Sequence, residues 1–430
     1  MKVKTGDYVK IKTKHSTHEG ILIARPDILE EGIEVLKLES GYNIGIDKKN
    51  ILSIEKLMAQ KPKKETKKGI KFKKELPTVS ILSFGGTISS KVDYKTGGTY
   101  ADYTAEDFVE MLPELSEIAN IKAKKIMGKM SEDFTPQDWK YMAGCIKEEI
   151  KSGVDGVVVT QGTDTMHFSA SAMSFMLQNL PVPVIFTASQ RSIDRGSSDA
   201  FMNLICSVKA AAGFDGAEVM TCMHGSSNDD YCLLIRGNKV RKMHTSRRDA
   251  FRPINKKPIS KVYSNGIIEI LNNNYKKRHK DAKLLCKPYF CDKTALVYVY
   301  PGFDPRIIDY YIKNDYKGIV IGATALGHVK SEGEKNVLPF IEKAINSGVV
   351  VVIASQTIYG STHKYVYSNL RKLSISLECE FADDLLPETA YIKLGWALGK
   401  TKCPSKAKKL FRETIAGEFP EKSCYKTYLY

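Results

Sequence analysis

Two threonines in glycine-bearing turns are the residues of this sequence best suited to chemistry. Thr87 follows Phe84-Gly85-Gly86, and Thr163 lies within Gln161-Gly162-Thr163-Asp164-Thr165-Met166. Each turn comes directly after a run of apolar, mostly β-branched residues, which is typical of a buried strand. A threonine at the carboxyl end of a parallel strand lies where open α/β sheets bind ligands, and glycines let backbone amides approach closely. We therefore expect Thr87 and Thr163 to face one substrate from two loops.

A threonine hydroxyl is a weak nucleophile, so amide or ester cleavage needs a base for its proton and donors for the oxyanion. A lysine hydrogen-bonded through a second threonine and oriented by a carboxylate would complete such a set. Asp164 adjoins Thr163, and Lys242 lies in a basic segment, 236–245, that follows another apolar run. We expect this segment also to reach the carboxyl edge of the sheet. On spacing alone, Lys242 is more typical of a solvated basic cluster.

The elements that position these residues belong to a predicted α/β fold. Residues 1–57 alternate apolar and polar positions between glycines, which predicts a small β-barrel-like module. Residues 58–77 form a lysine-rich linker that buries too little apolar surface to fold alone. From Thr78 to residue 271, strands alternate with helices, which predicts a parallel sheet covered on both faces. The pattern restarts after a basic crossing and predicts a smaller α/β domain over 294–430.

The individual elements of the larger domain follow from short apolar runs and from helical spacing. The strands are expected at 79–82, 156–159, 182–186 and 233–235, and the helices at 137–151, 166–180 and 199–212. His167 would lie early in the second helix, where we expect it to be packed or partly exposed and not catalytic.

Four motifs in order resemble L-asparaginases of the bacterial type and, more closely, the D subunits of archaeal glutamyl-tRNA(Gln) amidotransferases. They are the two threonine turns, the run 188–199 and the lysine in Arg241-Lys242-Met243-His244-Thr245. The resemblance extends through Pro301-Gly302-Phe303-Asp304-Pro305 and Leu386-Pro387-Glu388-Thr389-Ala390. It implies a two-domain asparaginase-like core. The family turn usually reads Thr-Gly-Gly-Thr-Ile, and Phe84 replaces its first residue, which affects local packing and not the nucleophile.

The resemblance implies a glutaminase with Thr87 as nucleophile and with Thr163, Lys242 and Asp164 as the group that handles the proton. Asp164 would also hold the α-ammonium of a free amino acid, and Ser131 its α-carboxylate. A lid tyrosine follows the first threonine in the family, and both Tyr94 and Tyr100 fit that position. The preference for glutamine over asparagine stays open. Gly-Thr-Asp alone would fit a helix N-cap equally well.

The β module ahead of the core separates the D subunits from free asparaginases, which ordinarily begin near Val79. No Gly-x-x-x-x-Gly-Lys-[Ser/Thr] loop occurs in the sequence, so no cofactor is expected in this chain. The resemblance places ATP and magnesium on a partner, the E subunit, which acts on charged tRNA(Gln). It also implies a homodimer within a heterotetramer. The alternatives are a stand-alone cytoplasmic L-asparaginase or glutaminase, and a catalytically silent RNA-binding scaffold.

Composition limits the setting in which the protein works. The formal net charge of +16 suggests a polyanionic partner such as RNA, or equally a lysine-rich solvated surface. Nine cysteines without paired short spacing predict neither a zinc site nor a disulfide framework, and they fit a reducing cytosol. The sequence has no signal peptide and no apolar run of about 18 residues, so we expect a cytoplasmic protein without a membrane anchor.

Overall fold

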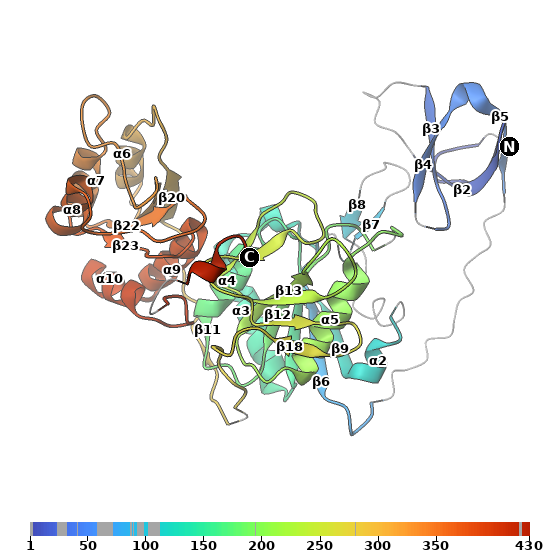
Figure 1. Cartoon of the computed structure of the whole chain (residues 1–430), viewed down its shortest axis with the longest axis horizontal. Helices are drawn as coiled ribbons and strands as arrows, with labels where there is room; N and C mark the ends of the chain where they lie inside the picture. The colour runs from blue at the N-terminus through green and yellow to red at the C-terminus, as the bar shows by residue number, and fades with distance from the viewer. Residues whose placement is uncertain are drawn as a thin grey trace.

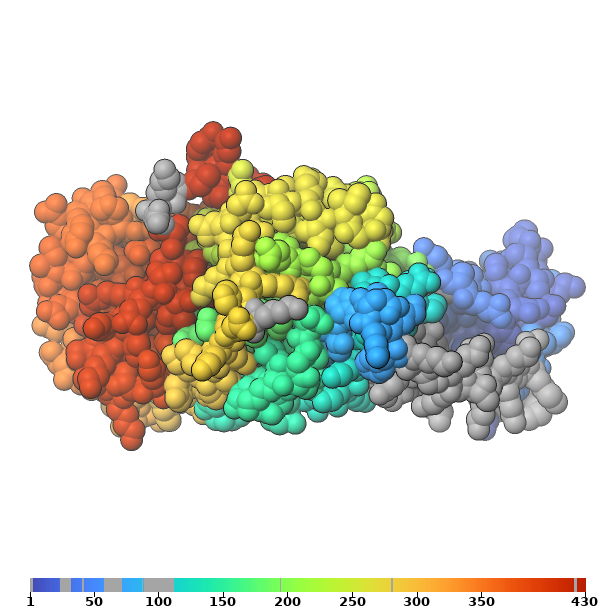
Figure 2. Space-filling view, turned by 90° about the horizontal axis from the view of Figure 1, so that it is seen from below, coloured from blue at the N-terminus to red at the C-terminus, as the bar shows by residue number. Residues whose placement is uncertain are grey.

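The computed structural model contains three parts, which follow one another along the chain (Figure 1). It describes residues 3–23, 32–40, 42–57, 72–86, 88, 112–193, 195–279, 281–420 and 424–430, together with the backbone of 90–92 and 99–101. Figure 2, seen from below, shows the C-terminal domain, the central domain and the N-terminal module in order along the long axis. The predicted linker lies mostly outside the described residues.

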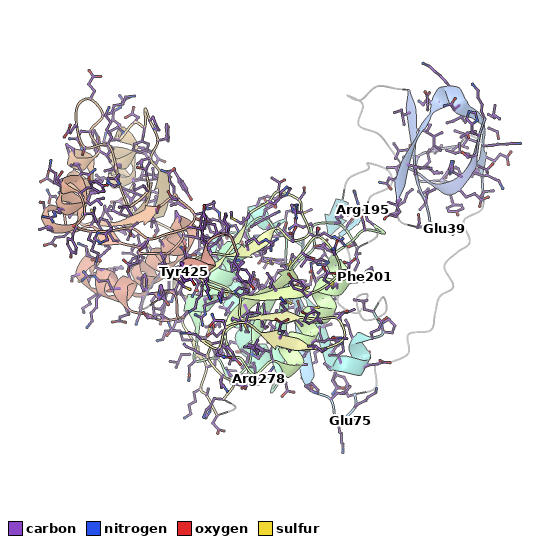
Figure 3. The ribbon with its side chains drawn as sticks, in the orientation of Figure 1. Glu39, Glu75, Arg195, Phe201, Arg278 and Tyr425 are labelled. Atoms are coloured by element: carbon purple, nitrogen blue, oxygen red, sulfur yellow. The ribbon has the colours of Figure 1, made fainter. Side chains whose placement is uncertain are left out.

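The N-terminal module is a five-stranded antiparallel sheet in the order β4-β3-β2-β1-β5. Its strands are β1 (Tyr8–Thr13), β2 (Thr17–Ile23), β3 (Ile33–Lys37), β4 (Asn43–Asp47) and β5 (Ile51–Lys56). Alternation with period two buries Val9, Ile11 and Leu36 in a small core. The turn between β3 and β4 approaches the central domain, where a Cβ on Gly196 would meet Ser40 and Tyr42. Glu39 and Arg195 lie near this contact (Figure 3).

The central domain is built on an eight-stranded sheet in the order β18-β17-β14-β13-β12-β10-β6-β9. Strands β9, β6, β10, β12 and β13 are parallel, which confirms the predicted parallel pairing for β6, β10 and β12. Their bounds are β6 (Thr78–Ser83), β9 (Asn120–Lys125), β10 (Gly156–Thr160), β12 (Val184–Thr187) and β13 (Val219–His224). Strands β9 and β13 were not predicted from the sequence. The remaining strands are antiparallel: β14 (Cys232–Arg236), β17 (Ser260–Val262) and β18 (Ile268–Ile270).

The all-parallel prediction is therefore wrong for the strand expected at 233–235. Only residues 225–231 separate β13 from β14. A parallel crossover needs a dozen or more residues, so this short connection makes a hairpin.

Helices cover both faces of the parallel part, which confirms the predicted α/β class. Helices α3 (Pro136–Lys151) and α4 (Met166–Met176) pack on the face with Val157 and Val159. Helices α2 (Leu115–Ile118) and α5 (Ala200–Gly213) pack on the opposite face with Val158. Helix α4 ends earlier than predicted because β11 (Leu177–Gln178) pairs with β19 (Leu285–Cys286). Shorter elements are β7 (Ser90–Val92), β8 (Thr99–Ala101), η3 (Ser131–Asp133), β15 (Val240–Lys242) and β16 (Phe251–Pro253).

The C-terminal domain has a four-stranded parallel sheet, β20 (Thr294–Tyr298), β21 (Gly318–Ala323), β22 (Val350–Ser355) and β23 (Glu380–Phe381). Helices α6 (Arg306–Lys313) and α7 (Leu338–Asn346) cover one face, and α9 (Pro387–Lys400) and α10 (Pro404–Arg412) cover the other. The short α8 (Ser368–Arg371) and η4 (Lys372–Ser376) precede β23. Helix α9 also packs against α4 of the central domain, which joins the two domains.

Arg278 anchors the connection between these domains (Figure 3). Its guanidinium donates to the carbonyl oxygens of Phe214, Asp155 and Ala211 at 2.5, 2.7 and 2.6 Å. Burial lowers the pKa of Arg278, and three carbonyl acceptors replace the water that the guanidinium loses.

Candidate active site

The two threonine turns are in backbone contact at the carboxyl edge of the sheet. Strands β6 and β10 are parallel neighbours, and the Phe84 amide donates to the Thr160 carbonyl at 2.8 Å. Gly86 has φ +84°, and a Cβ there would overlap the backbone of Gln161 and Gly162. Thr87 itself lies outside the described residues, but the chain that leads into it touches the turn that carries Thr163. The two turns therefore meet at one edge of the sheet, and the place of Thr87 beside Thr163 stays a prediction.

Phe84, the departure from the usual family turn, is fully buried in the hydrophobic core on the α3 and α4 face. Its ring replaces a threonine side chain by apolar packing one residue before the glycines. Gly85 then turns the chain with φ +102° against the backbone of Lys129. The substitution thus changes the support of the turn and leaves both glycines in the conformation that needs them.

Lys242, Thr163 and Asp164 form a hydrogen-bonded group. Lys242 Nζ donates to Thr163 Oγ1 at 2.8 Å and to Asp164 Oδ1 at 2.5 Å. Thr163 Oγ1 lies 3.3 Å from the same Asp164 oxygen. The Lys242 side chain is 10% exposed and that of Asp164 is 64% exposed, so the group opens to solvent on the carboxylate side. A hydroxyl between an amine and a carboxylate can pass a proton from a neighbouring nucleophile.

Lys242 reaches the carboxyl edge as predicted, but the reason given for this prediction is wrong. Strand β14 is antiparallel to β13, and Arg236 at its end lies opposite Met220 near the start of β13. The chain therefore reaches the amino edge, where the Gly237 amide donates to the Val219 carbonyl. It then turns, and β15 runs back beside α4. Helix α4 begins directly after the Thr163 turn, so this return brings Lys242 to the carboxyl edge.

Ser131 holds the Thr163 turn through two hydrogen bonds. Its hydroxyl accepts the Asp164 amide at 3.2 Å, and its carbonyl accepts the Thr165 hydroxyl at 2.5 Å. A Cβ on Gly162 would meet the Ser131 side chain at 2.8 Å, so glycine is needed for this approach. Ser131 is buried, 2% exposed, next to the proton-handling group. Its predicted contact with a substrate carboxylate stays a prediction.

The lid tyrosine remains open between the two candidates. Tyr94 lies outside the described residues. Tyr100 belongs to β8, whose backbone pairs with β7, and its side chain is outside the described part.

His167 is buried beside this group, in agreement with its predicted packing role. Burial, and then the positive charges of Arg241 and Lys242, lower the pKa of His167 to about 3. The imidazole is therefore neutral at physiological pH. Its Nε2 lies 3.8 Å from Glu388 Oε1 on α9. Glu388 also pairs with Arg241 at 3.0 Å, a contact that the sequence did not predict although both residues lie within its motifs.

Metal and membrane features are absent from the ranges that the structure describes. No group of three or more histidine, cysteine, aspartate or glutamate side chains is arranged to hold a metal ion there. No helix within those ranges is long and apolar enough to cross a membrane. All nine cysteines are described, and each is a free thiol in the structure.

Comparison with known sequences matches all three parts of the chain. The GatD N-terminal domain family matches residues 3–57, the asparaginase N-terminal family matches 78–276, and the glutaminase/asparaginase C-terminal domain family matches 293–411. The D subunit of the glutamyl-tRNA(Gln) amidotransferase of Pyrococcus furiosus is 45% identical, covering 97% of this chain and 95% of that protein. The D subunit of the same name from Methanosphaera stadtmanae is also 45% identical, covering 97% and 94%.

Solved structures match the core without the N-terminal module. The thermostable L-asparaginase from Thermococcus kodakarensis is 26% identical with a TM-score of 0.70, covering 80% of this chain and 100% of that chain. L-asparaginase I from Vibrio cholerae gives the same identity and TM-score, covering 80% and 99%. The asparaginase-like core is thus shared with free enzymes, and the match to the module distinguishes the amidotransferase relatives. On these matches over nearly its full length, the chain belongs to the family of glutamyl-tRNA(Gln) amidotransferase D subunits.

Proposed function

We propose that this chain hydrolyses glutamine with Thr87 as nucleophile and supplies ammonia for the conversion of Glu-tRNA(Gln) to Gln-tRNA(Gln). The observation that carries the proposal is the Lys242 amine within hydrogen-bonding distance of both Thr163 and Asp164, in a chain that also has the N-terminal module of the D subunits. The contact of Gly86 with Gly162 supports a common site for the two turns.

In the first half of the reaction, Thr87 Oγ1 attacks the side-chain amide carbon of glutamine, and its proton passes through Thr163 to Lys242, which accepts it as a neutral amine. The tetrahedral intermediate collapses, the carbon–nitrogen bond breaks, and the leaving nitrogen takes this proton back from Lys242 to depart as ammonia. In the second half, water attacks the ester and gives a proton to the same group, which passes it to Thr87 Oγ1 as the ester carbon–oxygen bond breaks. Glutamate is released and the enzyme is regenerated.

Substrate selection would use the open side of the group. The exposed Asp164 carboxylate is free on its solvent side to pair with the α-ammonium of a free amino acid. Ser131 is the candidate for the α-carboxylate. A peptide-bound glutamine lacks both charges, so the site would prefer the free amino acid.

The proposal includes partners that the chain itself does not contain. An E subunit would hold ATP and magnesium, activate the tRNA-bound glutamate and receive the ammonia, and this chain would need no cofactor of its own. A homodimer of this chain within a heterotetramer, working in the cytoplasm, would contact charged tRNA(Gln) mainly through the partner.

The second candidate is a stand-alone L-asparaginase or glutaminase, favoured by the similarity of the core to solved asparaginases. Ammonia release from glutamine by the isolated chain, and by the chain with its E subunit and charged tRNA, separates the two. Activity that rises with partner and tRNA supports the amidotransferase role. Vigorous hydrolysis that neither one changes supports the free enzyme.

A further inference from the structure

The C-terminal domain binds the segment that carries Lys242 through hydrogen bonds and ion pairs. We name residues 236–242 the lysine arm. Three hydrogen bonds and two ion pairs hold it, from the C-terminal domain and from the residues that follow α10. The hydrogen bonds are Arg236 to the Gly417 carbonyl at 3.1 Å, Asn238 to the Ala416 carbonyl at 3.0 Å and the Thr389 hydroxyl to the Asn238 carbonyl at 3.4 Å. The ion pairs are Lys239 with Asp384 at 2.7 Å and Arg241 with Glu388 at 3.0 Å. The arm leaves the sheet of one domain and is fixed by the other.

Glu388 pairs with the residue next to Lys242 and also lies near the helix that follows the Thr163 turn. It lies in the first turn of α9 and is 4% exposed. Its Oε1 lies 3.0 Å from Arg241 Nε, next to Lys242, and 3.8 Å from His167 Nε2. His167 is the second residue of α4, the helix that starts directly after the Thr163 turn. A single carboxylate thus lies between the two segments whose spacing sets the contact of Lys242 with Thr163.

The charges around Glu388 show which contact fixes it. His167 is neutral, because burial and two cations lower its pKa to about 3. The ionic partner of Glu388 is therefore Arg241. Tyr298 faces the same carboxylate, and burial together with the charge of Glu388 raises the pKa of this tyrosine to about 12. Arg241 is thus the one cationic group among these three neighbours of Glu388.

The strand geometry converts this ion pair into an orientation of Lys242. Successive side chains of a strand point to opposite sides, so the side chain of Arg241 turned toward Glu388 directs that of Lys242 the other way, toward Thr163. Strand β15 has three residues and, among the strands that the structure describes, pairs with β16 alone. The Arg241–Glu388 pair adds a support for its rotation beside α4.

We propose that Glu388 is a positioning residue for proton transfer, acting through Arg241 on Lys242. It touches neither the substrate nor the transferred proton. The inference rests on the proposed glutaminase function. It assigns the C-terminal domain a part in the chemistry of the same chain's N-terminal site.

Glu388→Ala tests this in the chain assembled with its E subunit and charged tRNA, with Glu380→Ala as the matched control. Glu380 is also a buried glutamate of this domain, 4% exposed, and pairs with Arg412 at 2.5 Å away from the lysine arm. We expect kcat for glutamine hydrolysis to fall roughly 10- to 100-fold in Glu388→Ala, as for a misplaced catalytic group, with KM little changed. Glu380→Ala should keep the wild-type kcat. An equal loss in both variants, or a change in KM alone, would overturn the inference.

Two further variants keep the test decisive if Glu388→Ala folds poorly. Glu388→Gln retains an oxygen that can accept from Arg241, so it should recover part of the lost kcat. Arg241→Met removes the pair from its more exposed partner. Combined with Glu388→Ala, it should lose no more activity than the worse single change, because both act through one contact. If the fold-losses in kcat of the two single variants multiplied in the double variant, the two residues would not act through one contact.

A readout that needs no turnover separates this inference from the glutaminase proposal. The rate at which an amine-reactive acylating reagent modifies Lys242 is measured by mass spectrometry in the wild type and in both alanine variants. A Lys242 released from Thr163 should react several-fold faster in Glu388→Ala only. An unchanged rate in Glu388→Ala refutes the positioning role even if glutamine is hydrolysed. An inactive wild type with the expected labelling refutes the proposed function alone.

Discussion

The contact between the two threonine turns makes Gly86→Ala the most informative single substitution. Gly86 has φ +84°, and Gly153, after helix α3, has φ +83°. Alanine at such a φ costs about 1–2 kcal/mol at either position. The surroundings differ, because a Cβ on Gly153 meets nothing within 4 Å and a Cβ on Gly86 overlaps the backbone of Gly162. Gly153→Ala therefore reports the cost of the backbone conformation alone.

The overlap sets the additional cost at Gly86. Neither neighbour is a flexible side-chain end, so the two turns must separate by roughly 1 Å, and such overpacking typically costs about 1–3 kcal/mol. We expect Gly86→Ala to lose about 2–5 kcal/mol of unfolding free energy and Gly153→Ala about 1–2 kcal/mol. A separation of this size at a reacting centre costs about 100-fold in rate. Hydrolysis should therefore collapse in Gly86→Ala and stay near the wild-type rate in Gly153→Ala.

The assay combines thermal unfolding with glutamine hydrolysis on both variants. In a domain of this size, 1 kcal/mol corresponds to about 2–4 °C in Tm, so the two variants should differ measurably. Equal Tm losses together with full activity in Gly86→Ala would refute the backbone contact between the turns. A collapse of activity in Gly153→Ala would show that the control is unsuitable and that remote strain suffices.

Three further predictions address the proton-handling group and the module. Lys242→Met should reduce ammonia release nearly as far as loss of the nucleophile, because members of one catalytic unit fail together; a wild-type rate would place the base elsewhere. His167→Gln should make the free energy of unfolding less sensitive to acid. Burial lowers the pKa of His167 from 6.5 to about 3, so the unfolded chain takes up a proton on this residue below pH 6.5 and the folded chain does not. At pH 5 this costs the wild type about 2 kcal/mol of unfolding free energy relative to pH 7. Urea unfolding at pH 7 and pH 5 compares the two, and identical pH slopes would contradict the burial argument. Deleting residues 1–74 should spare basal hydrolysis and weaken partner assembly or tRNA-dependent activation; unchanged transamidation would exclude a role for the module.

Strands β6, β10 and β12 could be predicted because each is a short apolar, mostly β-branched run between turn residues. Strand β10 illustrates this: Val157 and Val159 pack in the core on one face of the sheet, and Val158 packs in the core on the other. Strands β9 and β13 were missed, because β9 carries three lysines and β13 is rich in methionine and polar residues. The reversal at β14 could not be inferred from apolar runs alone, because a buried strand reads the same in either direction. The short connection, residues 225–231, would have indicated the reversal only if the preceding strand β13 had been predicted.

The candidate site divides in the same way. The glycines of the two turns could be identified because close backbone approach excludes a Cβ. Arg241 and Glu388 each lie within a recognisable motif, yet their contact joins residues from different domains. No local pattern encodes such a pairing. The return of β15 beside α4, which brings Lys242 to Thr163, is likewise a tertiary feature.

Covalent labelling with a diazoketone analogue of glutamine tests the role of Thr87 as nucleophile most directly. The analogue carries an electrophilic carbon close to the position of the amide carbon, so the attacking hydroxyl retains it, and peptide mass spectrometry identifies the modified residue. We predict one label per chain, on Thr87, strongly reduced in Lys242→Met and absent in Thr87→Val. A label on Thr163, or full labelling of Thr87→Val, would contradict this assignment.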